Sequence, residues 1–137
     1  MKVLLLNGST RKDGCTYLAL SEAAKPLQEA GIETEIVQMG GGAVRDCIGC
    51  NGCAGKGQCV FGDDMVNEMI AKAKAADGFV FGSPVYYAHP SGQMVICGGQ
   101  RVSDALLTAQ AVAAVLWLRP LRRSFLCNGV VRITSIK

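Results

Sequence analysis

Apolar and polar residues alternate along the first 82 residues in blocks that predict strands and helices in turn. Short apolar runs at residues 2–6 and 79–82 predict buried strands, and a mixed run at residues 33–39 predicts a strand nearer the sheet edge. Helical spacing of apolar residues predicts one helix between Thr16 and Gly31, and a second that follows Asp63 and Asp64. Strands that alternate with helices form a parallel sheet with ligands at the strands' carboxyl ends. The sequence therefore predicts an α/β fold.

The pattern weakens after Gly92. Residues 93–110 are compatible with a helix and residues 111–118 predict a fourth strand, but the last twenty residues suggest no further helix. The charge also shifts, from a net −2 over residues 1–100 to a net +5 over residues 101–137. Because the arginines of this basic part are interleaved with Leu, Val and Ile rather than clustered, we expect no nucleic-acid partner.

Composition bounds the class of protein. The chain has 137 residues, half of them apolar and 18% charged, which is typical of one folded domain spanning residues 1–137. The first apolar run is too short for a signal peptide, and no stretch approaches the ~20 residues of a membrane span. We therefore expect a cytoplasmic protein with no membrane partner. Its seven cysteines should stay reduced there, which favours metal or redox work over disulfides.

The loop after the first strand carries the first chemical signal. It reads NGSTRKDGCT and places the hydroxyls of Ser9 and Thr16 and the guanidinium of Arg11 at the start of a helix. Backbone amides and basic side chains at a helix N-terminus attract phosphate. The loop matches neither the P-loop nor the dinucleotide fingerprint. An ordinary polar loop is the alternative interpretation.

This loop resembles the phosphate loop of the flavodoxin-like NAD(P)H-dependent FMN reductases, whose usual form is GSPRKxGNT. The resemblance implies that Ser9, Arg11, Cys15 and Thr16 bind FMN. Two positions depart from the family pattern. Thr10 replaces a proline, and Cys15 replaces an asparagine, which removes an amide donor to the phosphate.

A second motif, GSPVYYAHPSG at residues 82–92, resembles the family's GSPVYxxxxSGxMK segment. The resemblance implies a loop along the flavin ring, formed by Ser83, Pro84, Val85, Tyr86 and Tyr87. A turn with structural tyrosines is the alternative. Because hydride transfer to or from a flavin needs no side-chain base, we assign no catalytic residue.

Four cysteines lie within thirteen residues, at positions Cys47, Cys50, Cys53 and Cys59. Their spacing resembles ferredoxin-type ligation of a [4Fe–4S] cluster, whereas four-thiolate zinc sites usually combine two separated pairs. Iron–sulfur flavoproteins of the reductase family carry a compact motif of this type after the second strand, so the resemblance implies these four residues as cluster ligands. Zinc binding and free or redox-active thiols remain open.

The resemblance covers residues 1–94 and ends there. Residues 95–137 lack the family's later signatures, and the chain ends tens of residues earlier than the family pattern. We hypothesise that this part is truncated or follows a frameshift; a divergent minimal variant is the alternative. The expected fold is a flavodoxin-like three-layer α/β/α sandwich with strand order 2-1-3-4, in which the family's fifth strand is missing.

The resemblance implies an FMN-dependent NAD(P)H oxidoreductase that passes electrons from flavin to a small-molecule or protein acceptor, through a [4Fe–4S] cluster if the cysteines hold one. Proteins of this family are generally homodimers or tetramers. Two alternatives belong to other classes: a flavin and iron–sulfur electron carrier without its own enzymatic activity, and a zinc-stabilised protein without a redox cofactor.

Overall fold

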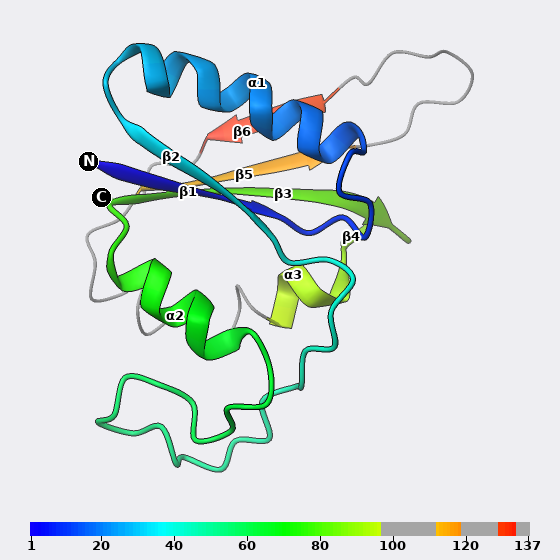
Figure 1. Cartoon of the computed structure of the whole chain (residues 1–137). Helices are drawn as coiled ribbons and strands as arrows, with labels where there is room; N and C mark the ends of the chain where they lie inside the picture. The colour runs from blue at the N-terminus through cyan, green and yellow to red at the C-terminus, as the bar shows by residue number, and fades with distance from the viewer. Residues whose placement is uncertain (97–111, 119–128, 134–137) are drawn as a thin grey trace.

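The computed structural model describes residues 1–96, 112–118 and 129–133. One mainly parallel sheet runs through this part of the chain, in the order β2-β1-β3-β5-β6 (Figure 1). Its strands are β1 (Lys2–Asn7), β2 (Glu33–Gln38), β3 (Gly78–Tyr86), β5 (Val112–Leu118) and β6 (Gly129–Ile133). The first four are mutually parallel, which confirms the predicted 2-1-3-4 order, with β5 as the fourth strand.

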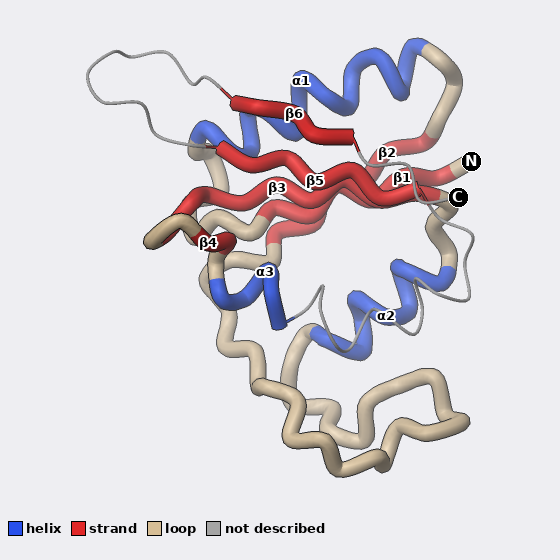
Figure 2. The backbone as a smooth tube through the Cα atoms, turned by 180° about the vertical axis from the view of Figure 1, so that it is seen from behind, coloured by secondary structure: helices blue, strands red, loops and turns tan. Residues whose placement is uncertain are grey.

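Helices cover both faces of the sheet. Helix α1 (Cys15–Glu29) lies on one face, and α2 (Val66–Lys74) and the short α3 (Gly92–Ile96) lie on the other (Figures 1 and 2). This confirms the three-layer α/β/α sandwich. No helix in the described residues is long and apolar enough to span a membrane.

The apolar run of β1 is the centre of the core because alternate residues face opposite layers. Leu4 packs in the cluster that includes Met69 of α2, and Leu5 packs in the cluster that includes Leu20 of α1. Both leucines are fully buried. A strand covered on both faces reads as a continuous apolar run, which explains the sequence pattern.

Both predicted helices are present, but the N-cap of α2 is Met65 rather than Asp63 or Asp64. Gly31 has a φ of 76°, the left-handed conformation that ends a helix readily at a glycine. At the start of α2, the Asp64 Oδ1 atom accepts a hydrogen bond from the Val66 N–H at 3.0 Å. The carboxylate thus satisfies one of the free amides at the helix start.

The third strand is longer than the sequence predicts. It does not stop at Ser83 and Pro84 but continues to Tyr86 and turns back into β4 (His89–Pro90), which pairs antiparallel with it. The expected loop is therefore largely a β-hairpin. Beyond Gly82 the neighbouring strand β1 has ended, and a proline is tolerated where a strand has lost one neighbour.

The position beyond β5 is occupied. Strand β6 pairs with β5 in the antiparallel direction, so it is not the parallel fifth strand whose absence the sequence predicts. The predicted helix over residues 93–110 is described only as far as Ile96, and residues 97–110 lie outside the described part.

Candidate functional site

The ends of β1 and β2 lie beside the middle of β3. Asn7, the last residue of β1, is in register with Gln38 of β2 and with Gly82 of β3. The Gly8 N–H continues this contact by donating to the Gly82 carbonyl at 2.8 Å. The loops after β1 and β2 and the last part of β3, from Ser83 to Tyr86, therefore lie side by side at the carboxyl edge of the sheet.

Asn7 ties the loops after β1 and β2 together. Its side chain is completely buried, and its Oδ1 atom accepts a hydrogen bond from the Ser9 N–H at 3.1 Å. Its backbone carbonyl accepts from the Met39 N–H at 2.8 Å. Its Nδ2 atom donates to Gln38 Oε1 at 2.7 Å, so the two side-chain amides form a bridge across the strand ends.

Gln38 adds two further hydrogen bonds to this bridge. Its Nε2 atom donates to the Ser9 carbonyl and, at 3.1 Å, to the Gly40 carbonyl. The sequence analysis did not single out either Asn7 or Gln38. For Asn7 the signal was present, since it is a polar residue at the final position of a strand of buried apolar residues; β2 has only one buried residue, so Gln38 carried no such signal.

The loop from Gly8 to Gly14 curls around the start of α1. The N-cap residue is Gly14, and no side chain in the described residues caps this helix. Ser9 and Thr16 are buried here, and the Arg11 N–H donates to Ser9 Oγ at 3.1 Å. A Cβ added to Gly14 would lie 3.8 Å from Ser9 Oγ, so this hydroxyl faces the helix start.

Two predicted site residues of this loop are exposed. Arg11 precedes the helix, and Cys15 is its first residue. The structure thus brings together all four residues that the sequence assigns to the phosphate loop. Ser9 in the loop and Thr16 in α1 are buried, whereas Arg11 and Cys15 are exposed.

The hairpin of β3 and β4 packs directly against this first loop through Ser83, in β3, and Ser91, which follows β4. Ser83 is buried, and its Oγ atom accepts from the Ser91 N–H and donates to the Pro84 carbonyl, each at 2.9 Å. A Cβ added to Gly8 would lie only 2.9 Å from Ser91 Oγ. The side chain of Ser83 therefore closes the hairpin segment and holds it beside the first loop.

The tip of the hairpin has an unusual backbone. Tyr87 and Ala88 both have positive φ values, 53° and 62°, which favour glycine or asparagine in such turns. Tyr86 and Tyr87 are exposed, whereas Pro84 and Val85 are half-buried. The two tyrosine rings therefore stand at the rim of the carboxyl edge, available to a flat ligand.

Gln93 of α3 joins the loop after β2 to the loop after β3. Its Oε1 atom accepts from the Gly41 N–H at 3.1 Å, and its Nε2 atom donates to the Gly42 carbonyl. These contacts fix the start of the cysteine-bearing segment to the same edge. The sequence analysis did not identify this residue.

The cysteine-bearing segment, residues 46–60, is a long loop before α2 that lies on the side of α2 away from the sheet (Figures 1 and 2). Cys47, Cys50 and Cys53 are exposed and Cys59 is half-buried. Among the described residues, no three His, Cys, Asp or Glu side chains are grouped as a metal site. The donor set itself suits iron or zinc, since it offers four thiols on a short loop with glycines at positive φ.

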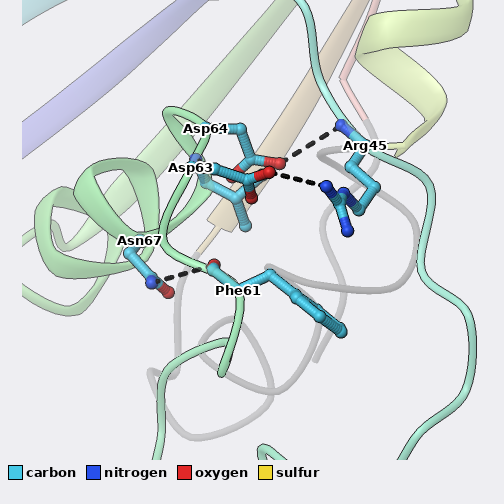
Figure 3. A network of polar contacts seen from close by, with 6 residues as sticks. Arg45, Phe61, Asp63, Asp64 and Asn67 are labelled. Carbon is cyan, nitrogen blue, oxygen red and sulfur yellow. Dashed lines mark hydrogen bonds and ion pairs between the residues drawn. The ribbon is translucent and has the colours of Figure 1, made fainter.

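A network of polar contacts joins the residues on either side of this segment (Figure 3). Arg45 pairs with Asp63 through Nη2 and Oδ2 at 2.6 Å, and its guanidinium lies 5.0 Å from the centre of the Phe61 ring. The Arg45 N–H also donates to Asp64 Oδ2 at 3.2 Å. The two ends of the loop are thereby held together.

These features define a flavodoxin-like α/β fold with a phosphate-loop candidate and a ring-loop candidate at one edge. A family model described as NADPH-dependent FMN reductase matches residues 1–96. The chain belongs to this family. The match ends close to residue 94, where the sequence resemblance also ends.

Curated relatives are iron–sulfur flavoproteins. The chain is 44% identical over 94 residues to one from Methanocaldococcus jannaschii, covering 69% of this chain and 48% of that protein. It is 37% identical over 94 residues to one from Archaeoglobus fulgidus, covering 69% of this chain and 42% of that protein. The matched part of the chain thus spans less than half the length of these two relatives.

Solved structures share the fold. RosB, solved with a bound 8-demethyl-8-formylriboflavin-5′-phosphate intermediate, matches with a TM-score of 0.56 at 17% identity, over 88% of this chain and 53% of RosB. A flavone reductase matches with a TM-score of 0.55 at 22% identity, over 77% of this chain and 30% of that chain. These similarities confirm the flavodoxin-like fold.

Proposed function

We propose that the chain binds FMN at the carboxyl edge of its sheet and acts as an NAD(P)H-dependent flavin oxidoreductase. The observation that carries this proposal is the start of α1, which has no side-chain cap among the described residues and lies beside the buried hydroxyls of Ser9 and Thr16. A phosphate suits such a place because it accepts several hydrogen bonds and interacts favourably with the helix dipole.

The individual residues take complementary roles in holding the phosphate. Ser9 and Thr16 donate hydroxyl hydrogen bonds from inside the loop, and Arg11 approaches from the solvent side with a charge-assisted contact. Asn7 and Gln38 touch no ligand, but they fix the backbone of Ser9 through hydrogen bonds at both its N–H and its carbonyl.

The hairpin after β3 supports the ring end of the same ligand. Residues 83–87 would line the ring end of this ligand, where the exposed Tyr86 and Tyr87 would offer aromatic surface at the rim. FMN, when bound, accepts a hydride from NAD(P)H and releases electrons to an acceptor.

The cysteine-bearing segment is the proposed outlet for those electrons. The names of the curated relatives support an iron–sulfur cluster, and the spacing of Cys47, Cys50, Cys53 and Cys59 favours the [4Fe–4S] type. A cluster held by these residues would supply one-electron transfer. The final acceptor is a small molecule or a protein, and we propose a homodimer or tetramer as the working assembly.

Anaerobic purification with added FMN tests this function. We expect flavin absorption in the purified protein and oxidation of NADH or NADPH when FMN and a dye acceptor are supplied. Ser9→Ala and Arg11→Ala should each weaken FMN binding about tenfold while leaving riboflavin binding unchanged, because a lost hydrogen bond to a charged group costs about 1.5–3 kcal/mol.

Lys25→Ala provides a control on the exposed side of α1, where the lysine pairs only with Glu22 among the described residues. Its FMN affinity should equal that of the unmodified protein. Absence of FMN binding would overturn the proposal. Flavin binding without any NAD(P)H oxidation would favour an electron carrier instead.

A further inference from the structure

The four cysteines of the proposed cluster are not equivalent. Cys59 is half-buried and the other three are exposed. The backbone of Cys59 is also held at both of its polar groups by one side chain. Its N–H donates to Asn67 Oδ1 at 2.7 Å, and its carbonyl accepts from Asn67 Nδ2 at 3.0 Å.

The position of Asn67 is fixed because this residue belongs to the first turn of α2. Its neighbour Val66 is fully buried, and Ile70, one turn later, is packed in the core cluster beneath the sheet. The Nδ2 atom of Asn67 also donates to the Phe61 carbonyl at 3.3 Å (Figure 3). Cys59 is therefore fixed relative to the sheet and not merely to its own loop.

The other three cysteines lie on a stretch whose backbone-to-backbone hydrogen bonds, among the described residues, stay within the loop, such as the one from the Lys56 N–H to the Cys53 carbonyl at 3.0 Å. Lys74 donates from Nζ to the Gly57 carbonyl at 2.6 Å, on the Cys59 side of the loop. The ion pair of Arg45 and Asp63 joins the two ends of the loop. The stretch with Cys47, Cys50 and Cys53 lies between these points and contains two glycines at positive φ, Gly49 and Gly55.

Because Cys59 is held in place and the other three cysteines are exposed, we infer that Asn67 is a positioning residue for the proposed cluster. It holds Cys59 in position before the cluster assembles, and the three exposed thiols then bind. The inference rests on the cluster of the proposed function. It assigns Asn67 no contact with iron. The residue acts by removing the conformational freedom of one ligand before the others bind, which lowers the entropy cost of assembly.

Two substitutions separate hydrogen bonding from packing. Asn67→Ala removes both hydrogen bonds to Cys59. Asn67→Asp keeps the size and the acceptor for the Cys59 N–H but loses the donor to the carbonyls of Cys59 and Phe61. The matched control is Gln28→Ala, which removes an exposed amide on α1 that bonds Thr34 on the opposite side of the sheet.

Two measurements are made on each variant. Anaerobic reconstitution with iron and sulfide, followed by competition with a chelator, gives cluster affinity through iron content and visible absorption. Iodoacetamide labelling of the metal-free protein, followed by peptide mass spectrometry, gives the alkylation rate of each cysteine. Far-UV circular dichroism checks that the variants fold, and FMN affinity is measured separately.

We expect Asn67→Ala and Asn67→Asp to weaken iron retention about tenfold, which corresponds to about 1.4 kcal/mol. The alkylation rate of Cys59 should rise several-fold in Asn67→Ala while that of Cys53 stays constant. Gln28→Ala should match the unmodified protein in both measurements.

Unchanged iron retention in both Asn67 variants, or an unchanged Cys59 alkylation rate in Asn67→Ala, would overturn the inference. If Asn67→Ala fails to fold, iron retention by Asn67→Asp decides. If the unmodified protein takes up no iron, both the proposed cluster and this inference are overturned. Iron uptake without FMN binding or NAD(P)H oxidation would instead overturn the reductase function and leave the role of Asn67 standing.

Discussion

Gly40 approaches the backbone of Ser9 so closely that no larger residue fits between them. A Cβ added to Gly40 would lie 1.9 Å from the Ser9 carbonyl oxygen. The loop that leads to the cysteine-bearing segment is thus in contact with the candidate phosphate loop. A change at Gly40 is therefore transmitted directly to a residue that we assign to FMN binding.

Gly40→Ala should destabilise the fold and weaken FMN binding together. Relieving the overlap requires movement of backbone rather than of a flexible side chain, and overpacking of this kind costs about 1–3 kcal/mol. The midpoint of urea unfolding should fall, and FMN titration should show a weaker complex. Gly42→Ala is the control, since nothing lies within 4 Å of a Cβ at that position. Equal unfolding midpoints for the two variants would contradict the packing argument.

Cys15→Asn should strengthen FMN binding. The exposed first residue of α1 is a cysteine here, whereas the family pattern has an asparagine whose amide donates to the phosphate. Restoring this donor should tighten FMN binding about tenfold, as expected for a hydrogen bond to a charged group. Riboflavin, which lacks the phosphate, should bind with unchanged affinity. Cys15→Ala should stay within about twofold of the unmodified protein, and an equal gain in that variant would show that the amide is not responsible.

Ala88→Gly should stabilise the protein. Ala88 has a φ of 62°, and the left-handed conformation costs a non-glycine residue about 1–2 kcal/mol. Glycine removes most of this cost. It also has more conformational freedom in the unfolded state, which offsets the gain by about 0.5–1 kcal/mol. We expect a net gain of about 0.5–1 kcal/mol in the free energy of unfolding, measured by urea denaturation. The same substitution at the exposed Ala71, inside α2, should instead destabilise by about 1 kcal/mol.

Glu35 should make stability depend on pH in the acidic range. Hydrogen bonds from Lys72 and then from Lys2 lower the pKa of this carboxyl below its ordinary 4.5. A lowered pKa in the folded state stabilises the protein above pH 4.5, and this stabilisation is lost as the pH falls through the folded pKa. Because the side chains involved are about one-third exposed, we expect a contribution of at most about 1 kcal/mol.

Glu35→Gln tests this expectation. The variant should be less stable than the unmodified protein at pH 7, and the difference should disappear at the acidic end of a series of urea unfolding curves. High salt should also reduce the difference at neutral pH, because it screens partly exposed ion pairs. A difference that grows towards acidic pH would contradict the assignment.

The first half of the fold could be predicted because its signals are local. The buried strand β1, the helix face of α1 and the glycine at its end each follow from a few neighbouring residues, and the structure confirms all three. The placement of the two candidate cofactor loops at one edge then follows from parallel pairing alone. The roles of their residues toward FMN stay predictions.

The parts that escaped prediction depend on contacts between distant residues. β3 continues through Pro84 because β1 has ended beside it and β5 has not, which depends on how far each neighbouring strand extends. The bridge between Asn7 and Gln38 joins positions 31 residues apart. The strand β6 at the edge pairs antiparallel with β5, and no local pattern among residues 129–133 specifies that direction.

The contacts of Gln93 have a consequence for the order in which the chain folds. This residue fixes Gly41 across 52 residues of sequence, whereas Asn67 fixes Cys59 across only 8. Short-range contacts form with less loss of chain entropy than long-range ones. We therefore expect the contact of Cys59 with Asn67 to form earlier in folding than the contact of Gly41 with Gln93, which needs a residue made much later in synthesis.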